Sequence, residues 1–244
     1  MLSLLIAVLV ATVIGGIIGY FVNIGFGIFT GIVITAALFF YLTRLFSKKL
    51  ESVFLQANGE LQKQHPERAI AILKEGYKFN HYAFLVKAQI DSQIGIILYT
   101  QKKFGEAYKY LKNSNPRILV AYGMMIIGHI KNNKKEAVDR DVKLLLRFNK
   151  KDPFAYSLCA YIYENELKDR EKALSVFNKG LKVMPENPKL KEHFTAFQNN
   201  RQYKMDKYGE IWYQMMLDKK GLSRLQNKMV RSQQKSMKVK NRVR

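Results

Sequence analysis

Residues 152–188 read DPFAYSLCAYIYENELKDREKALSVFNKGLKVMPENP, and this stretch decides the fold class of the chain. An apolar segment is followed by a charged turn and then by an amphipathic segment. In the second segment Ala173, Phe177, Gly180 and Leu181 recur at helical spacing, so they share one face of a helix. Small residues on that face allow a neighbouring helix to approach closely. The stretch therefore predicts two helices packed against each other.

This pattern resembles a tetratricopeptide repeat, in which small residues mark the crossing of two helices and an aromatic residue lies on the second helix. Pro185 stands where such a repeat ends its second helix. Alanines at Ala69, Ala107, Ala137 and Ala173 mark four copies, at separations of 38, 30 and 36 residues, scattered around the 34 residues of the family. The resemblance implies an all-α chain that contains a solenoid of helical hairpins.

Helical periodicity dominates the chain after residue 44, and alternating strand-like patterns are weak. Pro66 is placed to open a helix, because proline is favoured in the first helical turn. The last predicted helix carries Trp212, Met215 and Met216, which fit either a cap on the end of the solenoid or a methionine-rich groove for a partner helix. The expected helices cover residues 44–64, 66–76, 84–100, 104–114, 118–130, 135–148, 154–163, 172–183, 189–202 and 206–217.

The first 43 residues contain no charged side chain and no histidine. One helix of this length would be about 65 Å long, roughly twice the hydrocarbon thickness of a bilayer. Glycines and Asn23 interrupt the apolar run, so we expect two spans, residues 2–19 and 24–43, joined by a tight turn. A signal peptide is the alternative, but it would carry a basic start and a polar stretch after the cleavage site.

Arg44, Lys48 and Lys49 follow the second span directly, and the turn carries no charge. The positive-inside rule then places both termini in the cytoplasm, which predicts an integral protein of a bacterial cytoplasmic membrane. The spacings Gly15-x-x-x-Gly19 and Gly27-x-x-x-Gly31 are typical of closely packed membrane helices. These glycines serve either the packing of the two spans on each other or association with further copies. The oligomeric state is left open.

Composition and motifs argue against catalysis. The 244 residues carry a net charge of +22, and one cysteine, Cys159, lies in an apolar helix. The four histidines are scattered without metal-ligand spacing, so no metal site is predicted. Phosphate-binding glycine loops, nucleophile elbows and paired Cys-x-x-Cys motifs are absent from the sequence. We therefore expect a protein that is not an enzyme, with no catalytic residues and no cofactor.

The resemblance implies that the first helix of each pair lines a concave surface that binds a protein segment. Lys, Arg and Asn are sparse in these helices, so capture of a carboxylate terminus is not implied. The expected groove is apolar and aromatic. Its residues are Phe84, Gln89, Ile96, Tyr99, Tyr122, Ile126, Tyr161 and Ile162.

The chain ends in a basic tail, residues 219–244, which contains no acidic residue. Such a tail has too little apolar content for a core, so we expect it to be disordered. It is either a solvated tail without a target, or a contact for anionic lipids or for RNA. Its basic residues are Lys219, Lys220, Arg224, Lys228, Arg231, Lys235, Lys238, Lys240, Arg242 and Arg244.

Three parts are thus expected: a transmembrane hairpin (1–43), a helical-repeat domain with capping helices (44–218) and the basic tail (219–244). The leading hypothesis is a membrane-anchored scaffold whose repeat surface binds an unidentified protein at the cytoplasmic face. The alternative is a membrane-tethered protein that binds nucleic acid or ribosomes through the tail. A third possibility is an integral subunit whose hairpin packs into a larger translocase or envelope complex.

Overall fold

The computed structural model of the chain describes residues 2–82 and 85–218. Within these ranges every regular element is a helix, which confirms the all-α prediction. The chain divides into two compact units, unit 1 (Met1–Asn115) and unit 2 (Pro116–Arg244). Unit 1 thus joins the apolar hairpin to the helices that follow it.

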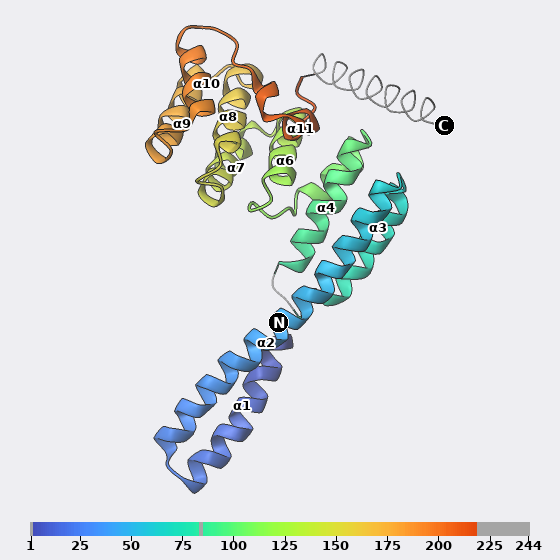
Figure 1. Ribbon diagram of the computed structural model, residues 1–244, viewed down its shortest axis with the longest axis vertical. Helices are drawn as coiled ribbons and strands as arrows, with labels where there is room; N and C mark the ends of the chain where they lie inside the picture. Colours follow the sequence, from blue (N-terminus) through green and yellow to red (C-terminus); the bar gives the residue numbers. More distant parts are fainter. Residues whose placement is uncertain (1, 83–84, 219–244) are drawn as a thin grey trace, which may run out of the picture. The chain divides into compact units, whose positions relative to one another are not determined.

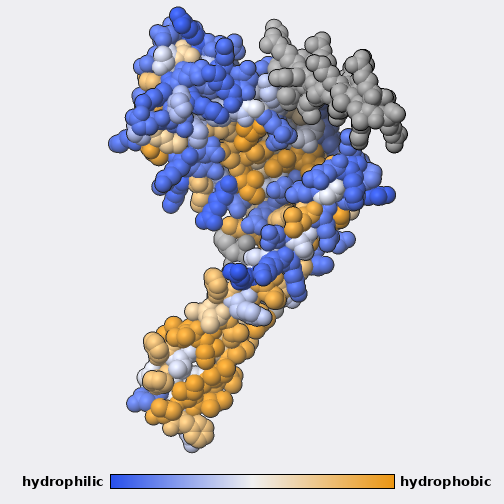
Figure 2. Space-filling model, in the orientation of Figure 1, coloured by the Kyte–Doolittle hydropathy of each residue, from blue (hydrophilic) through white to orange (hydrophobic). Residues whose placement is uncertain are grey.

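Unit 1 begins with the expected pair of apolar helices, α1 (Leu2–Phe21) and α2 (Ile24–Gln62) (Figure 1). The helices are joined by a two-residue turn, in which the Asn23 side chain accepts a hydrogen bond from the backbone N–H of Gly25 at 2.9 Å. This contact caps the first turn of α2. Figure 2 shows hydrophobic residues covering the visible face of the hairpin, with polar residues appearing farther along unit 1.

The second helix does not end where the charges begin but continues for 39 residues as one element. Its later turns bury Leu50, Val53 and Ala57, and these pack on the helices that follow. The next elements are α3 (Pro66–Glu75), the 3-10 helix η1 (Gly76–Phe79), α4 (Val86–Thr100) and α5 (Phe104–Leu111). Proline opens α3 as expected.

Unit 2 continues the series of helix pairs. Its elements are α6 (Leu119–Lys131), α7 (Lys135–Phe148), α8 (Pro153–Tyr161), the π-helical turn η2 (Ile162–Glu166), α9 (Arg170–Val183), α10 (Pro188–Gln198), the 3-10 helix η3 (Met205–Tyr208) and α11 (Glu210–Gln214). Side chains cap three of these helices: Asp152 accepts from the N–H of Phe154, and Asp169 and Asn187 cap α9 and α10. Caps of this kind each stabilise a helix start by about 1 kcal/mol.

The packing faces agree with the sequence in three of four copies. Ala69, Ala107 and Ala173 have no exposed surface. The fourth expected anchor, Ala137, is only half-buried, whereas its neighbour Val138 is fully buried. The register predicted for α7 was therefore wrong by one residue, which on a helix turns the packing face by about 100°.

The C-terminal end differs from the prediction of one helix over residues 206–217. Gly209 has φ +66° and ψ −138°, a backbone conformation that residues with a Cβ atom rarely adopt. It separates η3 from α11, so the segment bends instead of continuing as one rod. The helix expected to reach residue 202 likewise ends at Gln198.

Candidate functional site

Two surfaces are candidates for function, and the first is the hairpin of α1 and α2. Both helices are long and apolar enough to cross a bilayer, and only 11% and 6% of their most apolar stretches are buried in the structure. Large side chains such as Leu9 (65% exposed) and Phe29 (65% exposed) therefore have no protein contact that removes them from water. A surface of this kind is stable next to lipid or another apolar partner.

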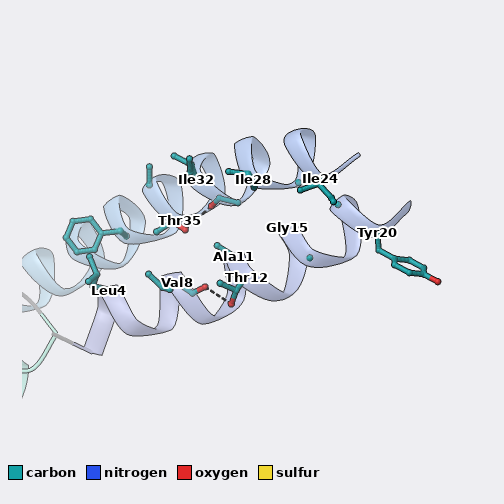
Figure 3. Close-up of a pocket in the computed structure, with 16 residues that line it drawn as sticks. Leu4, Val8, Ala11, Thr12, Gly15, Tyr20, Ile24, Ile28, Ile32 and Thr35 are labelled. Atoms are coloured by element: carbon teal, nitrogen blue, oxygen red, sulfur yellow. Dashed lines mark hydrogen bonds between the residues drawn. The ribbon is translucent and has the colours of Figure 1, made fainter. Parts of the chain in front are cut away.

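The two hairpin helices meet through glycines. A Cβ atom added at Gly27 would lie 2.5 Å from the carbonyl oxygen of Gly15 and 2.6 Å from Cα of Gly19. A Cβ atom added at Gly15 would in turn lie 3.3 Å from Cα of Gly31, so both glycine spacings are used inside the hairpin. On one side of this contact, small side chains leave an apolar groove of about 900 Å³ along both helices (Figure 3). Thr12 lines it, and its hydroxyl donates to the carbonyl of Val8 at 3.0 Å, so its polar group is satisfied within α1.

The predicted protein-binding residues fall in three groups. Phe84 lies outside the described residues. Tyr99, Tyr122, Ile126 and Ile162 have 5% or less of their surface exposed, so they offer little to a partner in this structure. The remaining three, Gln89, Ile96 and Tyr161, are half-buried.

Tyr161 leads to the second candidate surface, which belongs to unit 2. Its ring packs edge-on against Trp212 with ring centroids 4.8 Å apart, and against Tyr203 at 6.2 Å. On the same helix Phe154 packs against Tyr208 at 5.0 Å. Residues 203–217 therefore fold back over α8, and we refer to them as the C-terminal strap. Each aromatic pair adds about 0.5–1.5 kcal/mol beyond the burial of its surface.

The strap crosses the first helices of successive pairs rather than only the last one. Near its start, Tyr203 lies 5.3 Å from the ring of His193 on α10. Near its end, Met215 reaches α6, where a Cβ atom added at Gly123 would lie 3.4 Å from the methionine sulfur. Figure 1 shows α11 beside α6, as this contact requires. The surface of α6, α8 and α10 under the strap consists of Gly123, Phe154, Ser157, Tyr161 and His193, and we call it the first-helix face.

A small polar cluster lies at the centre of this contact. The Ser157 hydroxyl is 2.9 Å from the hydroxyl of Tyr208 and 3.1 Å from Nδ1 of His193. Ser157 and His193 have no exposed surface. Burial lowers the pKa of His193, because the charged imidazolium would lose its hydration, so the ring is held neutral. The cluster ties the strap to both α8 and α10.

Charged groups hold the outer edge of the strap. Lys207 forms an ion pair with Glu192 at 2.5 Å, and Lys189 lies over the ring of Tyr208 at 5.2 Å from its centroid. Both lysines are exposed, so these contacts contribute little to stability and mainly orient the strap.

Two further features of the described residues concern metal binding and the single cysteine. No group of three or more His, Cys, Asp or Glu side chains within them is arranged to hold a metal ion. Burial raises the pKa of the Cys159 thiol, so this cysteine is an unreactive core residue, as its apolar setting predicted. The ten basic residues of the tail lie outside the described residues.

Sequence reasoning named Tyr161, Trp212 and Met215 but missed the rest of the contact. Phe154, Ser157 and Tyr161 stand at positions i, i+3 and i+7, which is the spacing of one helix face, and this signal was available. His193 had no such signal, because its partners come from 36 and 15 residues away in the chain.

No protein-family model and no curated protein matches this chain. The solved structure of the MamA RS-1 ArsTM double mutant is similar to it, with 21% identity and a TM-score of 0.44 over 74% of this chain and 97% of that one.

Proposed function

We propose that the chain is a membrane-anchored scaffold for protein interaction, with the hairpin in the bilayer and the helix pairs at the cytoplasmic face. The observation that carries this proposal is the first-helix face of unit 2. The C-terminal strap, which belongs to no helix pair, packs on three successive first helices of unit 2. Its contacts there are made by aromatic and methionine side chains. The tetratricopeptide-repeat resemblance implies that this is the face on which such proteins hold a protein segment.

The hairpin supports the anchoring part of the proposal. Its exposed apolar surface needs a non-aqueous environment, and its length suits two crossings. Arg44, Lys48 and Lys49 are exposed on α2 just beyond the apolar stretch, where anionic lipid headgroups attract basic side chains. The same charges favour the cytoplasmic location of both termini.

A crosslinking experiment in intact membranes tests the proposal. The full chain is compared with the double variant Gln89→Ala/Tyr161→Ala, which removes two half-buried side chains from the first helices. The matched control is Lys109→Ala/Lys179→Ala, which removes two exposed side chains from second helices. A specific protein partner is expected to crosslink to the wild-type chain and to the control, and to be lost from the first-helix variant. Equal crosslinking of all three proteins would contradict the proposal.

The basic tail favours the alternative function, binding of nucleic acid or ribosomes. Ten basic residues without an acid in residues 219–244 give a strong, salt-dependent attraction for any polyanion. No aromatic residue is interleaved with them, so stacking on single-stranded bases is not supported. Loss of the partner on removal of residues 219–244, but not in the first-helix variant, would favour this function.

A further inference from the structure

The C-terminal strap occupies the surface that the proposed function assigns to a partner. We infer that the strap is a displaceable internal occupant of the first-helix face, and that the protein segment that replaces it carries the same chemistry. That segment would present aromatic side chains and a methionine at the spacing of Tyr208, Trp212 and Met215. The inference rests on the proposed function, because it concerns the regulation of the same face.

The direction of the strap supports its role as an occupant of this face. It begins at α10, passes over α8 and ends at α6, so it runs across the helices rather than alongside the last one. A cap that only closed the end of a solenoid would cover its last helix pair. Tyr203 also packs on Phe177 of the second helix α9, with ring centroids 5.5 Å apart, but the rest of the strap continues past this pair over α8 to α6.

The way in which the strap is held also supports its displacement. Its regular elements are η3, with four residues, and α11, with five, and neither length forms a stable helix in isolation. Its backbone hydrogen bonds join residues of the strap to each other, as from the N–H of Trp212 to the carbonyl of Gly209 at 3.1 Å. The contacts that attach it to the first-helix face are made by side chains. The order of the strap therefore depends on these side-chain contacts, which bury Tyr203, Trp212 and Met215.

The chemistry of the face beneath the strap defines the segment that could replace it. Phe154 and Tyr161 offer two aromatic rings about two helical turns apart on one face, and Gly123 leaves room for a methionine. Ser157 and His193 place one polar position between them. A segment that binds here must fill two aromatic sites and supply one hydroxyl or amide, which defines the partner by its side chains.

Hydrogen exchange on the full chain in lipid nanodiscs tests whether the strap opens. We expect the amides of residues 203–217 to exchange through a local opening, with protection at least tenfold lower than that of α8 and α9. Exchange of the strap only together with α8 and α9 would overturn the inference, because the strap would then be a fixed part of the core. The scaffold function would then be decided separately, by the crosslinking experiment described above.

A fluorescently labelled synthetic peptide of residues 203–217 tests whether the first-helix face becomes a binding surface when the strap opens. The peptide competes with the chain's own strap for this face. The covalently attached strap is present at an effective concentration of about millimolar, so wild-type protein is expected to bind the free peptide weakly. The full-chain variant Tyr208→Ala/Trp212→Ala is expected to bind it at least tenfold more tightly, because its own strap competes poorly. The matched control Phe148→Ala removes an exposed aromatic side chain outside the face and is expected to behave as wild type.

Three results of the peptide experiment are decisive. Tight binding by the strap variant, reversed by the additional change Ser157→Leu, supports the inference. Local opening without peptide binding by the strap variant would overturn the binding role of the face, and with it the proposed function. A concentration-dependent dimer of the wild-type chain that takes up no peptide would show that the occupant is the strap of a second copy, and would overturn the assignment to a foreign segment.

Discussion

Replacement of Ala173 by leucine is expected to destabilise unit 2 by about 1–3 kcal/mol, the usual cost of forcing extra methyl groups into a packed core. Ala173 has no exposed surface and lies on α9 where this helix packs against α8. Phe177, one turn later, is also fully buried, so the added side chain has no space on that side. For a folding unit of about 100 residues, this loss corresponds to a fall in Tm of about 4–20 °C.

Circular dichroism of the full chain in nanodiscs measures the Tm, and hydrogen exchange of the α8 and α9 amides shows whether the loss occurs in unit 2. The matched control is Ser175→Leu, which adds the same side chain at an exposed position of the same helix and is expected to change stability by less than about 0.5 kcal/mol. An Ala173→Leu protein with unchanged Tm and exchange would show that the packing register of α8 and α9 is wrong.

Three further predictions concern the hairpin, the strap and the tail. Gly27→Leu is expected to separate α1 from α2, because an added Cβ would lie 2.5 Å from the Gly15 carbonyl oxygen. Gly16→Leu is the control, since a Cβ at that position meets nothing within 4 Å. Distances between spin labels on the two helices measure the separation. Because the pKa of His193 is lowered in the folded protein, this side chain takes up a proton at a higher pH in the unfolded chain, at about 6.5, than in the folded one. Unit 2 should therefore lose stability between that pH and the folded-state pKa, with a shallower loss in His193→Gln, and an identical pH profile for the two proteins would refute this. A fragment of residues 44–244 is expected to bind anionic vesicles weakly and in a salt-sensitive way, and a fragment of residues 44–218 is expected to bind them much less. Vesicle binding that survives removal of the tail would contradict the assignment of the tail to lipid. A clear preference for structured RNA over vesicles at physiological salt would also contradict it.

The hairpin and the helix pairs were predictable from the sequence because their signals are local. Forty-three uncharged residues, broken once by Asn23, leave few alternatives to two long apolar helices. The faces of α3 and α9 follow from one repeating pattern of small and large residues. In α7 the pattern failed, because Ala137 and Val138 are adjacent apolar residues and periodicity does not choose between them. In the structure Val138 is the buried residue of the two.

The C-terminal strap was not predictable in the same way. Ile211, Trp212 and Met215 have helical spacing, so periodicity favoured one continuous helix, and only the conformation of Gly209 shows the break. The surface on which the strap lies depends on contacts between residues that are 50 or more positions apart, such as Ser157 and Tyr208. Long-range pairs of this kind leave no periodic trace in a single sequence.

The most direct test of the central claim is the labelling of single cysteines in intact cells of a bacterial host. Cys159 is fully buried and is replaced by alanine, and one new cysteine is placed either at Val22, which is 70% exposed in the turn of the hairpin, or at the exposed Lys182 of α9. A membrane-impermeant maleimide is expected to label Val22→Cys in intact cells and Lys182→Cys only after the cells are opened. Labelling of Lys182→Cys from outside, or recovery of both proteins in the soluble fraction, would contradict a scaffold held at the cytoplasmic face of the membrane.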